Sequence, residues 1–406
     1  MNDHILKTNQ FEPILLNKAR GSWVWDTAGI KYLDCESGMW CVNLGHNHLK
    51  VTQAIKSQVN GIIHRNKNFL TPITLEAAEY LLKFIPNEYD KLTFLNSGTE
   101  AMEFGINFAQ KVTKRKRILS LQDSYLGAYG IAKTLSYTSS GDSQLKVPYP
   151  ICNLENCNCL QTYQPIIDRI FQEFSSEIAC FTLEPVLVSG GIFRPCKAFI
   201  KYLCTKVSES GGLVVVDEIT TGMGRTGQRF GYEFYEIIPD VVILGKALGN
   251  GYPISAIVTR SYFESKLSSS DLYHVQSHQL DPLGAAIVKS VVNVYIEEKI
   301  IERSKVKSQK IKYALLTMDN SFIKEIRSYG MIFGIHITSD KRRSSKDIIL
   351  EIKNQLLKRG IIIGFNLRKD VLRLLPPLNI QDSEIGFLEE KIRTMFEFLK
   401  SNSKVF

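Results

Sequence analysis

The sequence lacks any apolar run that approaches the length of a membrane-spanning helix, so we expect no transmembrane segment. The N-terminal region also lacks the apolar core of a secretory signal peptide, because charged side chains such as Lys7, Glu12 and Lys18 interrupt it. These two absences predict a soluble cytoplasmic protein that makes no contact with a membrane.

Aromatic residues are missing from the most basic segments of the chain. The formal net charge is +9, and basic residues cluster over residues 111–117, 299–312 and 341–343. A nucleic-acid-binding surface would be expected to interleave aromatic side chains with its basic ones. We therefore interpret these segments as solvated helix faces and expect no nucleic-acid partner. The positive charge is compatible with a mild attraction for anionic substrates and an anionic cofactor.

The cysteines also lack the spacing of a common zinc motif. The chain has eight of them, and Cys152, Cys157 and Cys159 fall within one short segment. A structural zinc site usually has four ligands arranged as two spaced pairs. No fourth ligand lies close to these three in the sequence. We therefore predict free thiols in a surface loop and no metal site.

The length and the pattern of elements predict an α/β protein with two domains. The chain has 406 residues, which is enough for two hydrophobic cores. Strands and helices alternate from about residue 92 to 258, as in a wound, mainly parallel sheet, although residues 136–164 look like a long surface excursion. We expect a large domain over 49–290. A smaller α+β domain would combine part of 1–48, which also forms an N-terminal arm, with 291–406.

A single lysine follows a short predicted strand near the middle of the chain. Val241 to Leu244 are apolar, and Lys246 comes next between glycines. Burying a lysine is costly without a partner or a chemical use. In an apolar pocket its amine loses basicity and becomes a nucleophile towards aldehydes. The alternative is a surface lysine in a turn, and this stretch alone does not distinguish the two.

Two carboxylates occupy equivalent places at the ends of other predicted strands. The β-branched run over 213–216 ends at Asp217, and Glu184 follows a predicted strand over 178–183. Ligands bind open α/β sheets at the carboxyl ends of central strands. Each acid could instead be a helix cap or part of a structural ion pair.

A predicted strand over 92–95 leads into a helix that begins near Ser97, Gly98 and Thr99. Ser97 or Thr99 can cap the helix, and Gly98 lets a ligand approach the backbone. The free N–H groups at such a helix start form an anion site, most naturally for a phosphate, although an ordinary cap is the simpler interpretation. Tyr125 places an aromatic ring after the next predicted strand.

Together, these features describe a pocket for pyridoxal 5′-phosphate (PLP). The cofactor needs an amine for its aldehyde and an anion site for its phosphate. It also needs a carboxylate that keeps its pyridine nitrogen protonated, so that the ring accepts electrons. The chain order of phosphate site, aromatic ring, carboxylate and lysine is more specific than any one of the motifs.

With these motifs the sequence resembles the class III aminotransferases, the family that includes ornithine, acetylornithine, 4-aminobutyrate and ω-amino acid transaminases. The resemblance runs from about Trp25 to Ile380 and implies fold type I of the PLP-dependent transferases. It is carried by four motifs, Asn96-Ser97-Gly98-Thr99-Glu100-Ala101, Glu184-Pro185-Val186, Asp217-Glu218-Ile219-Thr220-Thr221-Gly222-Met223-Gly224-Arg225-Thr226-Gly227 and Gly245-Lys246-Ala247-Leu248-Gly249-Asn250-Gly251-Tyr252-Pro253.

The resemblance also implies individual roles in binding the cofactor. Lys246 would be the Schiff-base lysine, and Asp217 would pair with the pyridine nitrogen. Gly98 and Thr99 would hold the phosphate, and Tyr125 would stack on the ring. The remaining cofactor residues would be Ile219 on the opposite ring face, Glu184, and Ser277, which would reach the phosphate of a partner subunit in a homodimer with shared active sites.

Two further residues are expected to bind the substrate. Trp40 lies in a segment where an aromatic residue lines the substrate pocket of ω-transaminases, although a tryptophan is more often part of a core. Arg373 precedes a Pro-Pro pair, as in the family, where this arginine grips the substrate carboxylate. An arginine fork suits bidentate carboxylate binding.

Three positions depart from the family pattern. Leu126 stands where histidine is usual, and Thr220 stands where many members have glutamine, which changes one expected contact to the cofactor ring. Ser189 stands where ornithine-type enzymes carry a glutamate that masks the substrate-binding arginine. We therefore expect Arg373 to be free for an α-carboxylate, which argues mildly against an ornithine-type specificity.

The function predicted from the sequence is that of a PLP-dependent aminotransferase. It would move an amino group between an amino acid or amine donor and a keto acid through a Schiff base at Lys246, whose freed amine moves the proton. The alternative is a racemase, epimerase or aminomutase on the same fold, because these enzymes share every cofactor residue. A non-catalytic cofactor-binding protein is a more distant alternative, against which the intact Lys246 and Asp217 argue.

Overall fold

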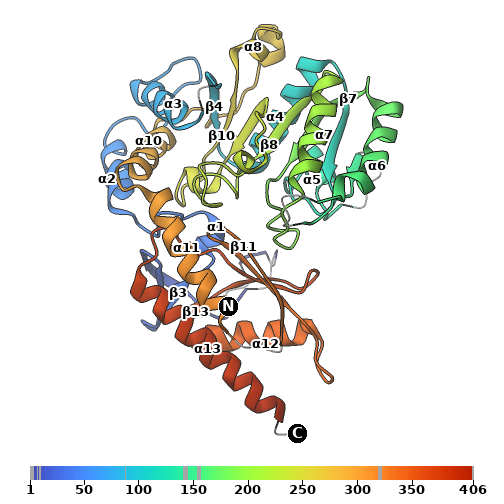
Figure 1. Ribbon diagram of the computed structural model, residues 1–406. Coiled ribbons are helices and arrows are strands. Elements are labelled where there is room, and N and C mark those ends of the chain that lie inside the picture. Colours follow the sequence, from blue (N-terminus) through green and yellow to red (C-terminus); the bar gives the residue numbers. More distant parts are fainter. Residues whose placement is uncertain are drawn as a thin grey trace.

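The computed structural model describes residues 4–6, 8, 11–86, 88–139, 145–152, 157–318 and 322–404. Figure 1 shows a larger part, built from the middle of the chain, above a smaller part that combines N-terminal strands with the C-terminal elements. None of the helices described is long and apolar enough to span a membrane.

The larger part is built around a seven-stranded sheet with the order β4-β10-β9-β8-β7-β5-β6. The strands from β5 to β9 pair in parallel, and β10 runs antiparallel to both β4 and β9. The strands are β4 (Lys91–Leu95), β5 (Arg117–Leu121), β6 (Leu145–Val147), β7 (Ile178–Leu183), β8 (Leu213–Asp217), β9 (Val241–Leu244) and β10 (Ser255–Thr259). The carboxyl ends of all these strands except β10 therefore meet at one edge of the sheet.

Helices cover both faces of this sheet. Val215 and Ile243 pack in the same cluster as helix α4, whereas Val214 and Val242 pack in the cluster that contains helix α7. This alternation explains why β7, β8 and β9 are buried at every position rather than at every second one. The helices of this part include α2 (Leu49–Gln58), α3 (Pro72–Phe84), α4 (Gly98–Thr113), α5 (Gly130–Leu135), α6 (Cys159–Phe174), α7 (Lys197–Glu209) and α10 (Pro282–Glu297), with the short elements η1 (Gly231–Tyr235), η2 (Lys246–Leu248), α8 (Ser261–Glu264) and α9 (Ser269–Leu272).

The smaller part has two four-stranded sheets. One sheet joins the two ends of the chain, because β13 pairs in parallel with β3. The first sheet consists of β1 (Leu16–Arg20), β2 (Trp23–Asp26), β3 (Lys31–Asp34) and β13 (Ile361–Ile362). The second sheet consists of β11 (Ile323–Tyr329), β12 (Ile332–Ile337), β14 (Gly364–Asn366) and β15 (Val371–Leu374). The helices are α1 (Ser37–Trp40), α11 (Ile300–Leu316), α12 (Ser345–Lys358) and α13 (Asp382–Lys404). In Figure 1, α11 runs from the larger part into the smaller one.

Two local predictions from the sequence are corrected by the structure. The segment 136–164 is not a continuous surface excursion, because β6 pairs with β5 at the sheet edge and α6 begins at Cys159. In the sequence, a long amphipathic pattern runs from Leu283 to about Met318 and predicts the connection to the smaller domain; the structure splits this segment into α10 and α11 at Lys299, whose φ is 49°.

No fourth ligand lies close to Cys152, Cys157 and Cys159 in the sequence, but the fold brings a fourth cysteine to them in space. Cys196, at the start of α7, brings its Sγ to 3.2 Å from that of Cys157, although 39 residues separate them in the sequence. All four sulfur atoms lie within 4.8 Å of one another, and none of the four cysteines forms a disulfide.

A fully buried arginine connects the two parts of the molecule. Arg225, in the glycine loop after β8, donates to the carbonyl oxygens of Pro376 at 2.5 Å and Met331 at 3.3 Å. It also hydrogen-bonds to Asn43 Oδ1 and Ser37 Oγ. Burial lowers its pKa to about 10, so the guanidinium stays charged and these acceptors compensate its burial.

Candidate active site

A cavity of about 170 Å³ lies where the carboxyl ends of the strands meet. Its walls come from the residues that follow β5, β7, β8 and β9 and from the first turn of α4 after β4. The lining residues are Gly98, Thr99, Tyr125, Leu126, Gly127, Glu184, Ser189, Asp217, Ile219, Thr220 and Lys246. Seven of the eight residues predicted to hold the cofactor are therefore brought together around one space.

Lys246 projects into this cavity from the short helix after β9. Its Nζ donates a hydrogen bond to Thr220 Oγ1 at 2.5 Å and lies 4.7 Å from the ring centroid of Trp40. Burial lowers the pKa of the amine, and the negative charge of Asp217 offsets part of that shift. The backbone of Lys246 is left-handed, with φ of 43°, a conformation that is uncommon outside glycine and often marks a functional site.

Two buried carboxyl groups face the same cavity. Asp217 ends β8 and is 6% exposed, and its Oδ1 accepts a hydrogen bond from the Ile219 backbone N–H at 2.8 Å. Burial raises the pKa of Asp217 to about 6. Burial also raises the pKa of Glu184, and repulsion from Asp217 raises it further. The pair can share a negative charge at neutral pH, and a cation between them would favour ionisation of both.

The first turn of α4 closes one end of the cavity with backbone donors. Ser97 caps the helix through Glu100 N–H at 3.1 Å, and Thr99 Oγ1 accepts from Ala128 N–H at 3.1 Å. The Thr99 hydroxyl hydrogen remains available for an anion. A Cβ on Gly127 would come within 2.8 Å of the Thr99 side chain, so glycine lets the loop after β5 pack here. Sequence reasoning did not assign Gly127 a role, although it lies two residues after Tyr125.

Ile219 separates the first turn of α4 from the loop before Lys246. A Cβ on Gly98 would lie 2.7 Å from Ile219 Cδ1, and one on Gly245 would lie 3.3 Å from Ile219 Cγ2. Both glycines therefore let this side chain form the floor of the cavity. The Tyr125 ring lies at the opposite, more open side, where the residue is 37% exposed, and its backbone N–H donates to Glu184 Oε2 at 2.6 Å.

Trp40 and Arg373 form a wall next to Lys246. The Trp40 ring has Lys246 Nζ 4.7 Å from its centroid and the Arg373 guanidinium carbon 4.8 Å from it. Arg373 projects from β15, which belongs to a different sheet from β9. Both side chains thus contact one aromatic ring, whose face attracts cations, while the charge of Arg373 contributes to lowering the pKa of Lys246.

The expectation that Arg373 has no masking carboxylate was wrong. Glu36 Oε2 lies 3.5 Å from an Arg373 terminal nitrogen and accepts a hydrogen bond from Trp40 Nε1 at 3.2 Å. Burial raises the pKa of Glu36 to about 7, although Arg373 and Trp40 pull it down. Ser189 indeed carries no carboxylate, but a glutamate from a distant part of the chain takes that place beside the arginine.

The turn that carries Glu36 and Trp40 is left-handed over four residues. The φ angles are 48° at Ser37, 55° at Gly38, 64° at Met39 and 67° at Trp40. Each left-handed residue other than glycine costs about 1–2 kcal/mol. The turn is retained by its contacts, since Gly38 N–H donates to Asp34 Oδ2 at 2.7 Å and Ser37 Oγ donates to the Leu375 carbonyl. Such strain is typical of a site whose side-chain directions matter.

The turn between β14 and β15 packs against the rim of the cavity. Arg368 and Lys369 form ion pairs with Asp123 at 3.0 and 2.8 Å. Asn366 Nδ2 donates to the Ser189 carbonyl at 2.7 Å. Sequence reasoning did not identify these contacts, which connect residues more than 170 positions apart.

Ser277 is the predicted cofactor residue that does not line the cavity. It is exposed in a turn after α9, and no hydrogen bond to another described residue involves it. Its predicted role concerned the cofactor of a partner subunit, and the single chain described here leaves that role a prediction.

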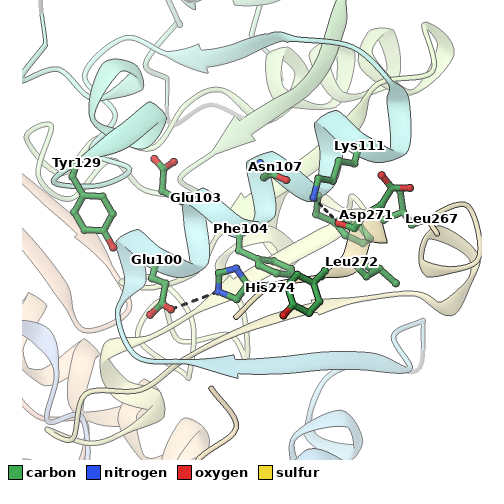
Figure 2. Close-up of a pocket in the computed structure, with 12 residues that line it drawn as sticks. Glu100, Glu103, Phe104, Asn107, Lys111, Tyr129, Leu267, Asp271, Leu272 and His274 are labelled. Carbon is green, nitrogen blue, oxygen red and sulfur yellow. Dashed lines mark hydrogen bonds and ion pairs between the residues drawn. The ribbon is translucent and has the colours of Figure 1, made fainter. Parts of the chain in front are cut away.

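A larger cavity of about 430 Å³ lies on the opposite side of α4 (Figure 2). Glu100 and His274 approach to 3.8 Å there, and Lys111 Nζ donates to the Asp271 carbonyl at 2.5 Å. This cavity lies between the outer face of α4 and the segment 267–274, away from the strand ends. Glu103 accepts a hydrogen bond from the Ala132 backbone N–H, and this cavity holds none of the residues predicted to bind the cofactor, so the cavity beside Lys246 is the better candidate for chemistry.

The donor set at the strand ends fits PLP. An amine of lowered basicity, two buried carboxyl groups, a helix start with a free hydroxyl and an exposed aromatic ring surround one cavity. These are the groups that the aldehyde, the pyridine nitrogen, the phosphate and the ring of the cofactor require.

The family model for class-III aminotransferases matches residues 6–396, so the chain belongs to this family. A LysW-aminoadipate semialdehyde/glutamate semialdehyde transaminase of Sulfurisphaera tokodaii is 30% identical over 371 residues, which cover 91% of each chain. An acetylornithine aminotransferase of Clostridium acetobutylicum is 29% identical over 395 residues, covering 94% of this chain and 96% of the relative.

The fold is also that of a solved structure, the ω-transaminase of Pseudomonas jessenii in complex with PMP. It superposes with a TM-score of 0.88 at 21% identity and covers 96% of this chain and 93% of its own. The chain is therefore a PLP-dependent transaminase of class III with the type I fold, and it uses an amino donor and a keto acid acceptor. These comparisons give no support to the racemase, epimerase or aminomutase alternative.

Proposed function

We propose that this transaminase acts on substrates that carry a carboxylate, with Lys246 as the proton-transferring residue and Arg373 as the carboxylate-binding residue. The observation that carries the proposal is that Lys246 and Arg373 both approach the Trp40 ring, at 4.7 and 4.8 Å from its centroid. A substrate bound beside Trp40 can place its amino group near Lys246 and its carboxylate near Arg373.

The residues around the cavity would hold the cofactor as follows. Asp217, with support from Glu184, would pair with the protonated pyridine nitrogen. Gly98 and Thr99 would hold the phosphate, while Tyr125 and Ile219 would cover opposite faces of the ring. When bound, the cofactor supplies an aldehyde and an electron-accepting ring.

Lys246 would then carry the proton between two carbon atoms. Its lowered pKa leaves a larger neutral fraction near pH 7 than an ordinary lysine has, and a neutral amine can accept a proton. Thr220 Oγ1, at 2.5 Å, is the nearest acceptor for the protonated amine and would hold it in place between the two transfers.

The choice of substrate would depend on whether Arg373 binds Glu36 or the substrate carboxylate. Glu36 is the carboxylate already beside it, and a substrate carboxylate must compete with that contact. An incoming anion is a stronger competitor when Glu36 is protonated, because the arginine then lacks a negatively charged partner. A donor with one carboxylate and a terminal or α-amino group would place the carboxylate at Arg373 and the amino group near Lys246.

The same proposal includes a homodimer and the domain limits inferred from the sequence. A serine that serves the partner's cofactor must be exposed in its own subunit, and Ser277 is. We propose two-fold dimers with shared sites, domains over 1–48 with 291–406 and over 49–290, and a cytoplasmic location. Light scattering of the PLP-bound protein tests the dimer, and a monomer that retains full activity would contradict it.

The experiment that tests the proposed activity is a visible spectrum of the purified protein with PLP, recorded before and after a panel of amino donors is added. We expect the band of the lysine-bound cofactor to bleach with donors that carry a carboxylate and to return with a keto acid. A band that persists with every donor, together with exchange of the donor's Cα hydrogen, would favour an isomerase instead.

A variant separates catalysis from cofactor binding. Lys246→Ala should bind PLP without a covalent bond and should lose at least about 10³-fold in kcat. Lys133→Ala, which changes an exposed lysine on α5, is the matched control and should keep wild-type activity. Amino transfer at a normal rate in Lys246→Ala would contradict the proposed role.

A further inference from the structure

Four cysteine thiols converge at a place that the transamination site does not use. Cys152 and Cys157 precede α6, Cys159 is its first residue, and Cys196 immediately precedes α7. Their sulfur atoms lie within 4.8 Å of one another, and the Cys157 and Cys196 sulfurs are 3.2 Å apart. We propose that these four cysteines bind one zinc ion in a closed tetrahedral site.

The geometry matches a mononuclear ion. With Zn–S bonds of about 2.3 Å, tetrahedral coordination separates the sulfurs by roughly 3.8 Å. The observed upper limit of 4.8 Å needs only small side-chain adjustments to reach that value. In an iron–sulfur cluster the cysteine sulfurs bind different iron atoms and must stand further apart. Four thiolates in a tetrahedron are the ligand set that zinc prefers.

The backbone holds the two halves of the site together without the metal. Ile151 and Pro195 form an isolated antiparallel bridge, and Cys196 N–H donates to the Pro150 carbonyl at 3.0 Å. The ligands on each side of this bridge are therefore adjacent before any ion binds. Such pre-organisation reduces the entropy that a metal must offset when it closes a loop.

The surroundings favour the net charge of the complex. Binding converts four thiols into thiolates, releases four protons to solvent and leaves a complex with a charge of −2, with no change of oxidation state. The N-terminal ends of α6 and α7, which are 16 and 13 residues long, both meet the cluster. The guanidinium of Arg194 interacts electrostatically with Cys152.

The site would be structural rather than catalytic. All four positions are filled by protein ligands, so no coordination site remains for a substrate or a water molecule. The zinc ion would anchor the C-terminal end of the segment between β7 and α7 through Cys196. That segment carries Glu184 and Ser189, which line the cavity beside Lys246. Zinc would thus stabilise the fold and one wall of the active site.

The test is a metal analysis of the full-length protein, purified with a reductant from a zinc-supplemented culture. Mass spectrometry of metals should find about one zinc per chain in the wild type and in Cys204→Ala, and almost none in Cys159→Ser and Cys196→Ser. Cys204 is the matched control because it is a buried cysteine on α7 outside the cluster.

A second measurement needs no variant. Titrating the wild-type protein with a mercurial reagent should release one zinc per chain, detected with a metal-binding dye. Chelation should lower the melting temperature by on the order of 5 °C. Three results would overturn the proposal, namely wild-type protein with reduced thiols but no stoichiometric metal, a disulfide between Cys157 and Cys196 in freshly purified protein, or stoichiometric iron in place of zinc.

Discussion

The candidate active site has two walls that are built in different ways, one lining the cavity and one beside Lys246. On one wall, Asp217 and Lys246 each follow a strand of the same sheet, so a single rule about strand ends positions both. On the other wall, Glu36, Trp40 and Arg373 come from a left-handed turn and from a strand of a second sheet. Under the proposed function, the first wall would supply the chemistry common to the family, whereas the second would contact the substrate and could vary with it.

This difference predicts that changes on the first wall affect every substrate, while changes on the second wall affect carboxylate substrates alone. The two walls meet at Trp40 and Lys246, where the lysine Nζ lies 4.7 Å from the centroid of the tryptophan ring. The four variants below test this division, from the largest expected effect to the smallest.

The largest effect is expected for Asp217→Asn. An amide cannot stabilise a positive charge on the pyridine nitrogen, so kcat should fall by about 10²–10³-fold for all donors. Single-turnover absorbance with two donors, one lacking a carboxylate, measures this loss. Glu218→Gln is the matched control, because this neighbouring buried carboxyl bonds to Thr221 and Tyr232 instead of facing the cavity. Normal turnover by Asp217→Asn would contradict the role proposed for Asp217 in stabilising the charge on the pyridine nitrogen.

Arg373→Gln should distinguish the two walls, because its effect should depend on whether the donor carries a carboxylate. Losing a charge-assisted hydrogen bond of about 1.5–3 kcal/mol lowers kcat/KM by roughly 10- to 100-fold for amino acid donors. Donors without a carboxylate should lose little. Steady-state kinetics with a matched acid and amine pair measures the difference, with Arg342→Gln on the exposed surface as control. An equal loss with both donors would show that Arg373 acts on the fold or the cofactor instead.

Gly98→Ala should weaken cofactor binding without changing substrate preference. The new Cβ would lie 2.7 Å from Ile219 Cδ1 and displace the floor of the cavity. Overpacking of this kind costs about 1–3 kcal/mol, which corresponds to roughly a tenfold higher Kd for PLP. Fluorescence titration of the cofactor-free protein measures it. Gly386→Ala, where no atom lies within 4 Å of the new Cβ, should bind PLP normally.

Glu36→Gln should have the smallest effect on catalysis and a clear dependence on pH. Above pH 7 the wild-type carboxylate is ionised and competes for Arg373, so the variant should show a KM for carboxylate donors about threefold lower at pH 8. The difference should shrink at pH 6, where Glu36 is largely protonated because burial raises its pKa to about 7. A KM ratio that is constant with pH would argue against competition at Arg373.

The same variant tests the sign of the linkage to stability. Because the pKa of Glu36 is raised in the folded protein, its stabilising contribution is full below about pH 4.5 and is lost as the pH rises through 7. A glutamine cannot ionise, so Glu36→Gln does not lose stability in this way as the pH rises. Its free energy of unfolding relative to wild type should therefore rise between pH 5 and pH 8, by on the order of 3 kcal/mol. Urea unfolding of the cofactor-free proteins at both pH values measures the change.

The sequence was most informative where chemistry follows a strand directly. Lys246, Asp217 and Glu184 were all predicted at strand ends, and all three line one cavity. The parallel arrangement of β5 to β9 was also predictable, because uninterrupted β-branched runs indicate strands that are buried on both faces. Less predictable was β6, whose three residues lie at the sheet edge and carry too short a pattern for assignment.

Where the sequence was insufficient, the partner lay far along the chain. Glu36 meets Arg373 because β13 pairs with β3 and thereby brings the two ends of the molecule together. Cys196 meets the other three cysteines because β7 and α6 intervene and return the chain to the same place. No pattern within either local segment specifies such a contact.

By itself the sequence determined the class of chemistry, since periodicity identifies the strands and each strand's last residues then carry the lysine and the acids. It also determined the family, through motifs whose spacing follows from those strand ends. The tertiary structure alone decided that Glu36 pairs with Arg373, that Lys246 and Arg373 both approach the Trp40 ring and that a fourth cysteine completes a cluster. The physical reason is that these contacts depend on how sheets pack against one another, and packing is a property of the whole folded chain.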